Sequence, residues 1–148
     1  MPGGKNMKKI LTLILLSALL CAALSLSVFA DDTQIQPRSN NYMVANASFT
    51  ISSTGNASVT VRYIGYASVF DGAKITSKIQ KNESGTWVDV NNGQPDNTWT
   101  DTSTLVSFNT THTHQLTERG TYRAVVNFEI WGRGGATDCV EKIVEYVY

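Results

Sequence analysis

Two histidines separated by one residue are the first candidates for chemistry. His112 and His114 lie in the run Thr-His-Thr-His, and on an extended strand such a pair projects from one face, as half of a metal site does. They are the chain's only histidines, and the nearest acidic residue in the sequence is Glu118. We therefore predict no native metal site and interpret the pair as part of an exposed, mildly polar strand row that includes Thr110.

The polar segment 89–101 is a second candidate. It combines three aspartates with three asparagines, namely Asp89, Asp96, Asp101, Asn91, Asn92 and Asn97. Oxygen-rich loops can bind calcium, but the fixed ligand spacing of an EF-hand is absent. The sequence leaves two interpretations open, a calcium-binding loop and an ordinary solvated turn.

Catalytic patterns are missing from the chain. No serine lies in a Gly-x-Ser-x-Gly frame, no His-Glu-x-x-His occurs, and the glycine-rich segment 132–136 lies between two strand-like runs. Cys139 is interpreted as a half-buried apolar residue, with a disulfide between chains or a reactive thiol as the alternatives. We predict a protein that is not an enzyme and has no cofactor; a hydrolase whose site escapes these patterns is the alternative.

Residues 1–30 have the pattern of a secretory signal peptide. Lys8 and Lys9 precede an apolar run over 10–28, and the chain continues through Ala30 into two aspartates. We expect cleavage after Ala30 and secretion from the cell. An uncleaved membrane anchor is the alternative, because about 19 apolar residues can just span a bilayer.

The residues before Met7 suggest where translation begins. The codons of Gly3 and Gly4 can spell a bacterial ribosome-binding sequence a short distance upstream of Met7. We hypothesise that translation starts at Met7 and that the source is bacterial.

Cleavage would leave a chain the size of one domain. Of its 118 residues, nine are basic and twelve acidic, which gives a formal charge of −3. Such a chain has no basic surface for nucleic acid or an anionic membrane. Cys139 is its only cysteine, so no disulfide can form within it.

Alternation of apolar and polar residues dominates the remaining chain. After a polar lead-in over 31–41, predicted to be flexible, a domain is expected over 42–148. Its apolar residues recur at every second position, which is typical of half-buried antiparallel strands. Strands are predicted at 45–51, 57–63, 73–80, 86–90, 104–115, 123–131 and 138–148. About seven strands with short turns predict an all-β antiparallel β-sandwich.

The segment Glu118-Arg119-Gly120-Thr121-Tyr122 precedes one of these strands. It resembles the tyrosine corner of immunoglobulin-like domains, in which a tyrosine hydroxyl hydrogen-bonds to the backbone just upstream. Gly120 and Tyr122 are therefore expected to form a structural corner. The chain also resembles small secreted proteins of Gram-positive bacteria whose function is unknown. It departs from true immunoglobulin domains in lacking the cysteine pair, because Ala124 occupies the position of the second cysteine.

Exposed aromatic residues are the best candidates for a binding site. If Tyr122 and Phe128 face inward, Arg123 and Trp131 lie on the outward row, while Trp99 lies in a polar loop. Indole surface is suited to sugar rings and protein partners, although a tryptophan covering the end of the sandwich is the other interpretation of Trp131. We predict a secreted binding module at or near the bacterial cell surface, with a protein or a cell-wall glycan as partner. A small secreted effector, such as a toxin or bacteriocin-like protein, is the alternative.

Overall fold

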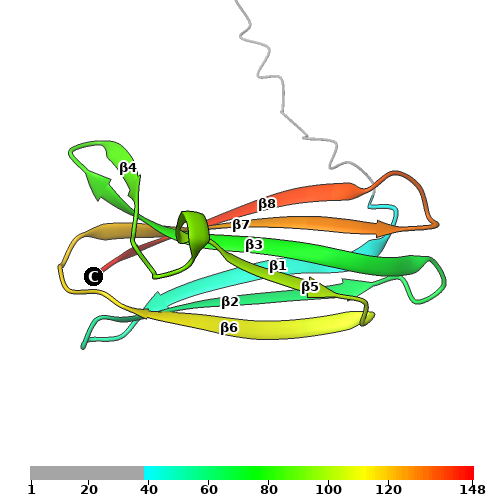
Figure 1. Cartoon of the computed structure of the whole chain (residues 1–148), viewed down its shortest axis with the longest axis horizontal. Helices are drawn as coiled ribbons and strands as arrows, with labels where there is room; N and C mark the ends of the chain where they lie inside the picture. Colours follow the sequence, from blue (N-terminus) through cyan, green and yellow to red (C-terminus); the bar gives the residue numbers. More distant parts are fainter. Residues whose placement is uncertain (1–38) are drawn as a thin grey trace, which may run out of the picture. The chain divides into compact units, whose positions relative to one another are not determined.

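Eight β-strands form the part of the chain that the computed structural model describes, residues 39–148 (Figure 1). A single turn of 3-10 helix, η1 (Pro95–Asn97), precedes the fifth strand. The strands are β1 (Tyr42–Ile51), β2 (Asn56–Gly65), β3 (Phe70–Glu83), β4 (Thr86–Asp89), β5 (Trp99–Ser103), β6 (Ser107–Gln115), β7 (Thr121–Gly132) and β8 (Asp138–Val147). The predicted leader over residues 1–30 lies outside the described residues.

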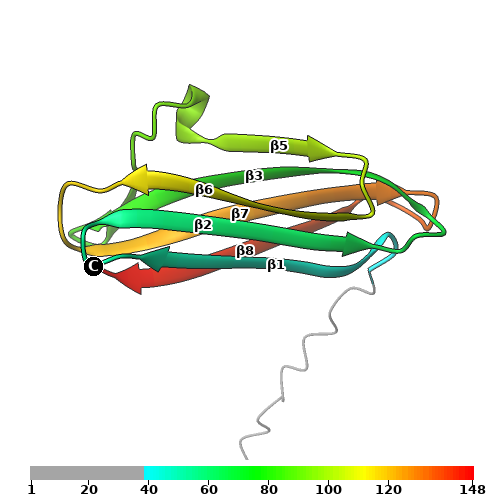
Figure 2. The same cartoon turned by 90° about the horizontal axis from the view of Figure 1, so that it is seen from below.

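The strands form two antiparallel sheets that pack face to face. One sheet has the order β1-β2-β6 and the other the order β4-β3-β7-β8, with β5 also paired to β3. β4 and β5 pair with successive parts of the same edge of β3. Figure 2 shows the first sheet lying over β3, β7 and β8, with β5 beside β6. The predicted sandwich is confirmed, and its strand order is that of an immunoglobulin-like fold, in which strands A, B and E face C, F and G.

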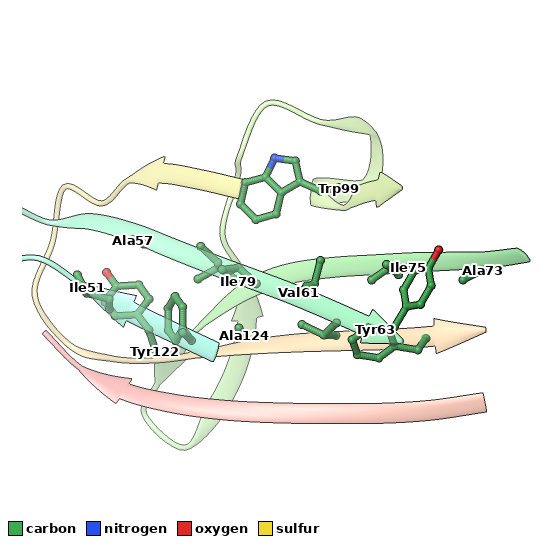
Figure 3. Packing of buried hydrophobic residues seen from close by; sticks show 14 of the residues in the cluster. Ile51, Ala57, Val61, Tyr63, Ala73, Ile75, Ile79, Trp99, Tyr122 and Ala124 are labelled. Atoms are coloured by element: carbon green, nitrogen blue, oxygen red, sulfur yellow. The ribbon is translucent and has the colours of Figure 1, made fainter. Parts of the chain in front are cut away.

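The predicted alternation places the apolar rows in the core. Phe49 and Ile51 on β1 and all four inward residues of β2 are buried, and so are five alternate residues of β7. The residues of these two rows are Ala57, Val59, Val61 and Tyr63 on β2, and Tyr122, Ala124, Val126, Phe128 and Ile130 on β7. Figure 3 shows side chains from both sheets meeting between the layers. Because nearly every inward position is apolar, burial of these rows fixes which face of each strand points inward.

The tyrosine corner is confirmed. The hydroxyl of Tyr122, a residue only 2 % exposed, donates a hydrogen bond of 2.8 Å to the carbonyl oxygen of Glu118. Gly120, with φ of 154°, exchanges backbone hydrogen bonds with Tyr148, at 3.2 Å and 2.9 Å. The crossover from β6 to β7 is therefore attached to the end of the chain as well as to its own strand.

Two of the short turns depend on residues with positive φ. The turn between β1 and β2 has Gly55 at φ of 86°, and the amide of Gly55 donates to the carbonyl of Ser52. The strands predicted at 73–80 and 86–90 extend closer to each other than expected, because β3 and β4 leave only Ser84 and Gly85 between them. Both residues have positive φ, as a two-residue type I′ turn requires.

The strand predicted at 104–115 begins three residues later than expected. β5 ends at Ser103 in one sheet, and β6 begins at Ser107 in the other. The hydroxyl of the buried Tyr63 donates a hydrogen bond of 2.8 Å to the carbonyl of Leu105, within the crossing segment. The chain thus changes sheets where the sequence shows only a continuous run of threonine, serine and apolar residues.

The predicted flexible lead-in, residues 31–41, falls mostly outside the described residues, and its last two positions are anchored. Asn41 is fully buried and donates through Nδ2 to the carbonyl of Ala136 at 2.9 Å. The backbone amides of Asn40 and Asn41 both donate to the carboxylate of Asp138. Asn40 and Asn41 are therefore attached to the start of β8 and to the connection before it.

Candidate functional site

The outer face of the five-stranded sheet carries connected aromatic and polar side chains near β4. On β7, Cζ of Arg123 lies 4.3 Å from the centre of the Trp87 ring, and its Nε donates a hydrogen bond of 2.7 Å to Oε1 of Gln80. Nε2 of Gln80 donates to Oδ1 of Asp89 at 2.6 Å, and Nζ of Lys78 donates to Oδ2 at 3.0 Å. We call these five residues the platform.

Strand register brings the platform together. Gln80 on β3 is the cross-strand partner of both Asp89 on β4 and Arg123 on β7. Outward residues of three adjacent strands therefore meet in one row, with Gln80 in the middle and only 9 % exposed. The chain alternates inward and outward residues on each strand, so the platform and the core are formed by the same pattern.

Hydrogen bonds to its carboxylate keep Asp89 ionised. The Gln80 amide and, next, the Lys78 ammonium lower the pKa of the Asp89 carboxyl, because both donate to its charged form. Asp89 therefore holds Gln80, and Gln80 holds Arg123, over the pH range in which carboxylates are normally charged. This series of hydrogen bonds orients the Arg123 guanidinium without neutralising its charge.

Trp131 lies on the same outer face, as the alternation predicted. It is half-buried and is the cross-strand partner of Gly72 on β3. A Cβ atom on Gly72 would lie 2.6 Å from Cζ2 of the indole, so the ring rests where β3 has no side chain. Trp131 thus stays partly open to solvent without projecting as a free side chain.

The prediction that Trp99 lies in a polar loop is wrong. Trp99 begins β5 and is only 8 % exposed, with its ring stacked on His112 at 5.2 Å between centroids and 5° between planes. Figure 3 places its indole beside β6, away from the other labelled core residues. Pairing of β5 with β3 turns the side chain inward, an effect of tertiary pairing that loop composition does not reveal. Trp99 consequently offers little surface to a ligand.

The histidine row is half-buried, which corrects its predicted exposure. His112 and His114 do share one face of β6, but that face points toward the other sheet, because their partners on β2 are Val59 and Ala57. Nε2 of His112 lies 2.7 Å from Oδ2 of Asp101 on β5. The pair and the stacked Trp99 connect β5 to β6 across the sandwich.

The three aspartates of segment 89–101 do not converge. Asp89 belongs to the platform, Asp101 contacts His112, and Asp96 is exposed within η1. Among residues 39–148, no three or more His, Cys, Asp or Glu side chains are grouped so that they could hold a metal ion. The calcium-binding interpretation of this segment gains no support from its geometry.

A cleft of about 380 Å³ opens beside the tyrosine corner. Among the residues lining it are His114, Lys81, Glu118 and Tyr122. Lys81 and Glu118 form an ion pair that raises the pKa of the lysine and lowers that of the glutamate. Burial raises the pKa of the Tyr122 phenol. Because its principal charges are already paired, this cleft is a weaker candidate than the platform.

Cys139 is exposed rather than half-buried. It lies on β8 as the cross-strand partner of Glu129, and it is a free thiol. β8 is an edge strand on which Cys139 alternates with inward residues, so its side chain points out from the sheet. Its interpretation as an apolar, partly buried position is therefore wrong.

Sequence reasoning missed Trp87 and Gln80 as site residues. The contact between Gln80 and Asp89 is local in the sequence, because the two-residue turn at Ser84-Gly85 pairs these residues across β3 and β4. Arg123 is 43 positions from Gln80 in the chain, and nothing local indicates that β3 and β7 are neighbours. The candidate Arg123 was found, but its partners were not.

Comparison with known proteins adds no family. No protein-family model matches the chain, and no curated protein matches it. Within the described part of the chain, no helix has the length and apolar character needed to cross a membrane.

Proposed function

We propose that this protein is a secreted, non-enzymatic binding module that attaches to a protein or a cell-wall glycan at or near the bacterial surface. The observation that carries the proposal is the outer face of the five-stranded sheet, which bears two half-buried indoles in fixed positions, Trp87 on β4 and Trp131 on β7. Asn127 and Glu129, on the same face of β7, are exposed, whereas Val125 in the same row is buried. Aromatic surface held in place loses little conformational entropy on binding.

Secretion is part of this proposal and rests on the sequence. Lys8, Lys9 and the apolar run before Ala30 have the order of a signal peptide. We propose that the chain is cleaved after Ala30 and that it is similar to the small secreted proteins of Gram-positive bacteria named above. The immunoglobulin-like strand order and the confirmed corner at Tyr122 are consistent with that likeness. A fold alone carries no activity, so the function depends on the outer face.

The test is a binding assay with purified protein and isolated bacterial cell walls, before and after protease treatment of the walls. Trp131→Ala and Trp87→Ala should each weaken binding by about 1–3 kcal/mol under conditions in which circular dichroism shows both variants to be folded. Val88→Ala is the matched control, because Val88 is 41 % exposed but is adjacent to Trp87 on β4 and faces the opposite way. Loss of binding after protease treatment of the walls would indicate a protein partner, and unchanged binding would indicate a glycan.

Two results would contradict the proposal. Binding that is equally strong in both tryptophan variants would remove the outer face as the site. Reproducible turnover of generic hydrolase substrates by the purified protein would show an enzyme instead.

A further inference from the structure

Arg123 is a fixed cation that forms no ion pair within the described part of the chain. Its Nε is hydrogen-bonded to Gln80 at 2.7 Å and its Cζ lies over the Trp87 ring at 4.3 Å. No ion pair joins it to an acidic residue within 39–148, and no side-chain hydrogen bond of its two Nη atoms occurs there. Free Nη groups on an oriented guanidinium form the planar fork that binds a carboxylate through two parallel hydrogen bonds.

The rest of the face limits how much negative charge a ligand can carry. Two lysines lie on the same outer face of β3, and both are already paired, Lys78 with Asp89 and Lys74 with Glu129. Glu145 and Glu141 on β8 are the cross-strand partners of Arg123 and Asn127. On the outer face as residues 39–148 form it, one unpaired cation among several acidic side chains suits a ligand with an isolated carboxylate, and it disfavours a dense polyanion or a strongly acidic protein surface.

The two indoles define the length of the ligand. Trp131 is eight residues from Arg123 along β7, which at about 3.3 Å per residue corresponds to roughly 26 Å. A ligand that contacts the platform and Trp131 together must therefore be extended along the strand. Stacking on indoles is a property of sugar rings, and a chain of sugars supplies both the length and neutral units between charges.

We propose that Arg123 binds the carboxylate of an acidic sugar in a glycan chain that lies along β7. This proposal rests on the function proposed above and names its ligand class. Trp87 and Gln80 act as positioning residues that hold the guanidinium, and Trp131 contacts a more distant sugar of the same chain.

The experiment compares three probes in titrations of the purified protein: an oligosaccharide in which glucuronic acid alternates with neutral N-acetylglucosamine, the same oligosaccharide with its carboxyl groups reduced to alcohols, and a poly-glutamate peptide. The wild-type protein should bind the uronate at least tenfold more tightly than the reduced form. Arg123→Gln should abolish this preference, while Arg123→Lys, which keeps the charge but not the fork, should retain only part of it. Lys74→Gln is the control on the same face and should leave the preference intact.

A structural readout accompanies the titration. The uronate should shift the NMR signals of the Arg123 Nε–H and the Trp87 indole N–H in the wild-type protein and in Lys74→Gln. The indole N–H signal of Trp87 also reports whether each variant, including those at Arg123, remains folded.

Three results of the titrations would overturn parts of the proposal. Equal affinity for the two oligosaccharides overturns the role of Arg123 but leaves the binding module standing. Tighter binding of poly-glutamate than of either sugar replaces the glycan with an acidic protein. No binding to any probe overturns the ligand class, and the cell-wall assay then decides separately whether the proposed function also fails.

Discussion

Loss of the Tyr122 hydroxyl should measurably destabilise the domain. Tyr122→Phe removes one oxygen from a residue that is 2 % exposed, and with it the 2.8 Å hydrogen bond to the Glu118 carbonyl. The ring itself stays in the core, so the change isolates the corner hydrogen bond. A net loss of about 1 kcal/mol is expected, and up to about 3 kcal/mol if the Glu118 carbonyl remains buried without a partner.

The corresponding change in melting temperature follows from the size of the domain. Unfolding entropy is about 2.1 cal/mol/K per residue, which for roughly 110 residues gives about 230 cal/mol/K. A loss of 1 kcal/mol should therefore lower Tm by about 4 °C, and 3 kcal/mol by about 13 °C. Urea unfolding followed by circular dichroism should show a lower midpoint with an unchanged slope.

Two further tyrosines provide the comparison. Tyr66→Phe is the control, since Tyr66 is 37 % exposed and no side-chain hydrogen bond of its hydroxyl occurs among the described residues. Tyr63→Phe removes a second buried hydrogen bond, to the Leu105 carbonyl at 2.8 Å, and should resemble Tyr122→Phe. If Tyr122→Phe and Tyr66→Phe both have the melting temperature of the wild-type protein, the corner hydrogen bond does not stabilise the fold.

Two more predictions concern the outer face. Gly72→Ala should lower the free energy of unfolding in urea by about 1–3 kcal/mol, because the new methyl group would lie 2.6 Å from Cζ2 of Trp131. In a protein that also carries Trp131→Leu, the same change should be tolerated. An equal cost in both backgrounds would refute the contact. Asp89 has a lowered pKa, so its contribution to stability is present above the unfolded-state value of about 4 and is lost as pH falls through the lower folded-state value. Wild-type protein should therefore exceed Asp89→Asn in Tm near neutral pH, and the difference should shrink below pH 4; a constant difference from pH 7 to pH 2 would show that Gln80 and Lys78 do not act through the carboxylate.

The sequence by itself determined which residues of most strands face the core. Alternation in β1, β2 and β7 leaves only one register in which the apolar residues are buried, and shifting a strand by one position would expose all of them. The corner at Tyr122 could also be predicted from the sequence, because its hydrogen bond to Glu118 spans only four positions. Local pattern also identified Arg123 and Trp131 as outward residues on one strand.

Tertiary structure alone decided which strands are neighbours, and with that the site. Composition makes 89–101 a loop, yet pairing of Trp99 with Ser77 makes its last part a strand and places the indole against His112. In the same way Arg123 meets Trp87 only because β3 lies between β4 and β7. Such contacts join residues far apart in the chain, and their stability comes from burying both sheets at once rather than from any local preference.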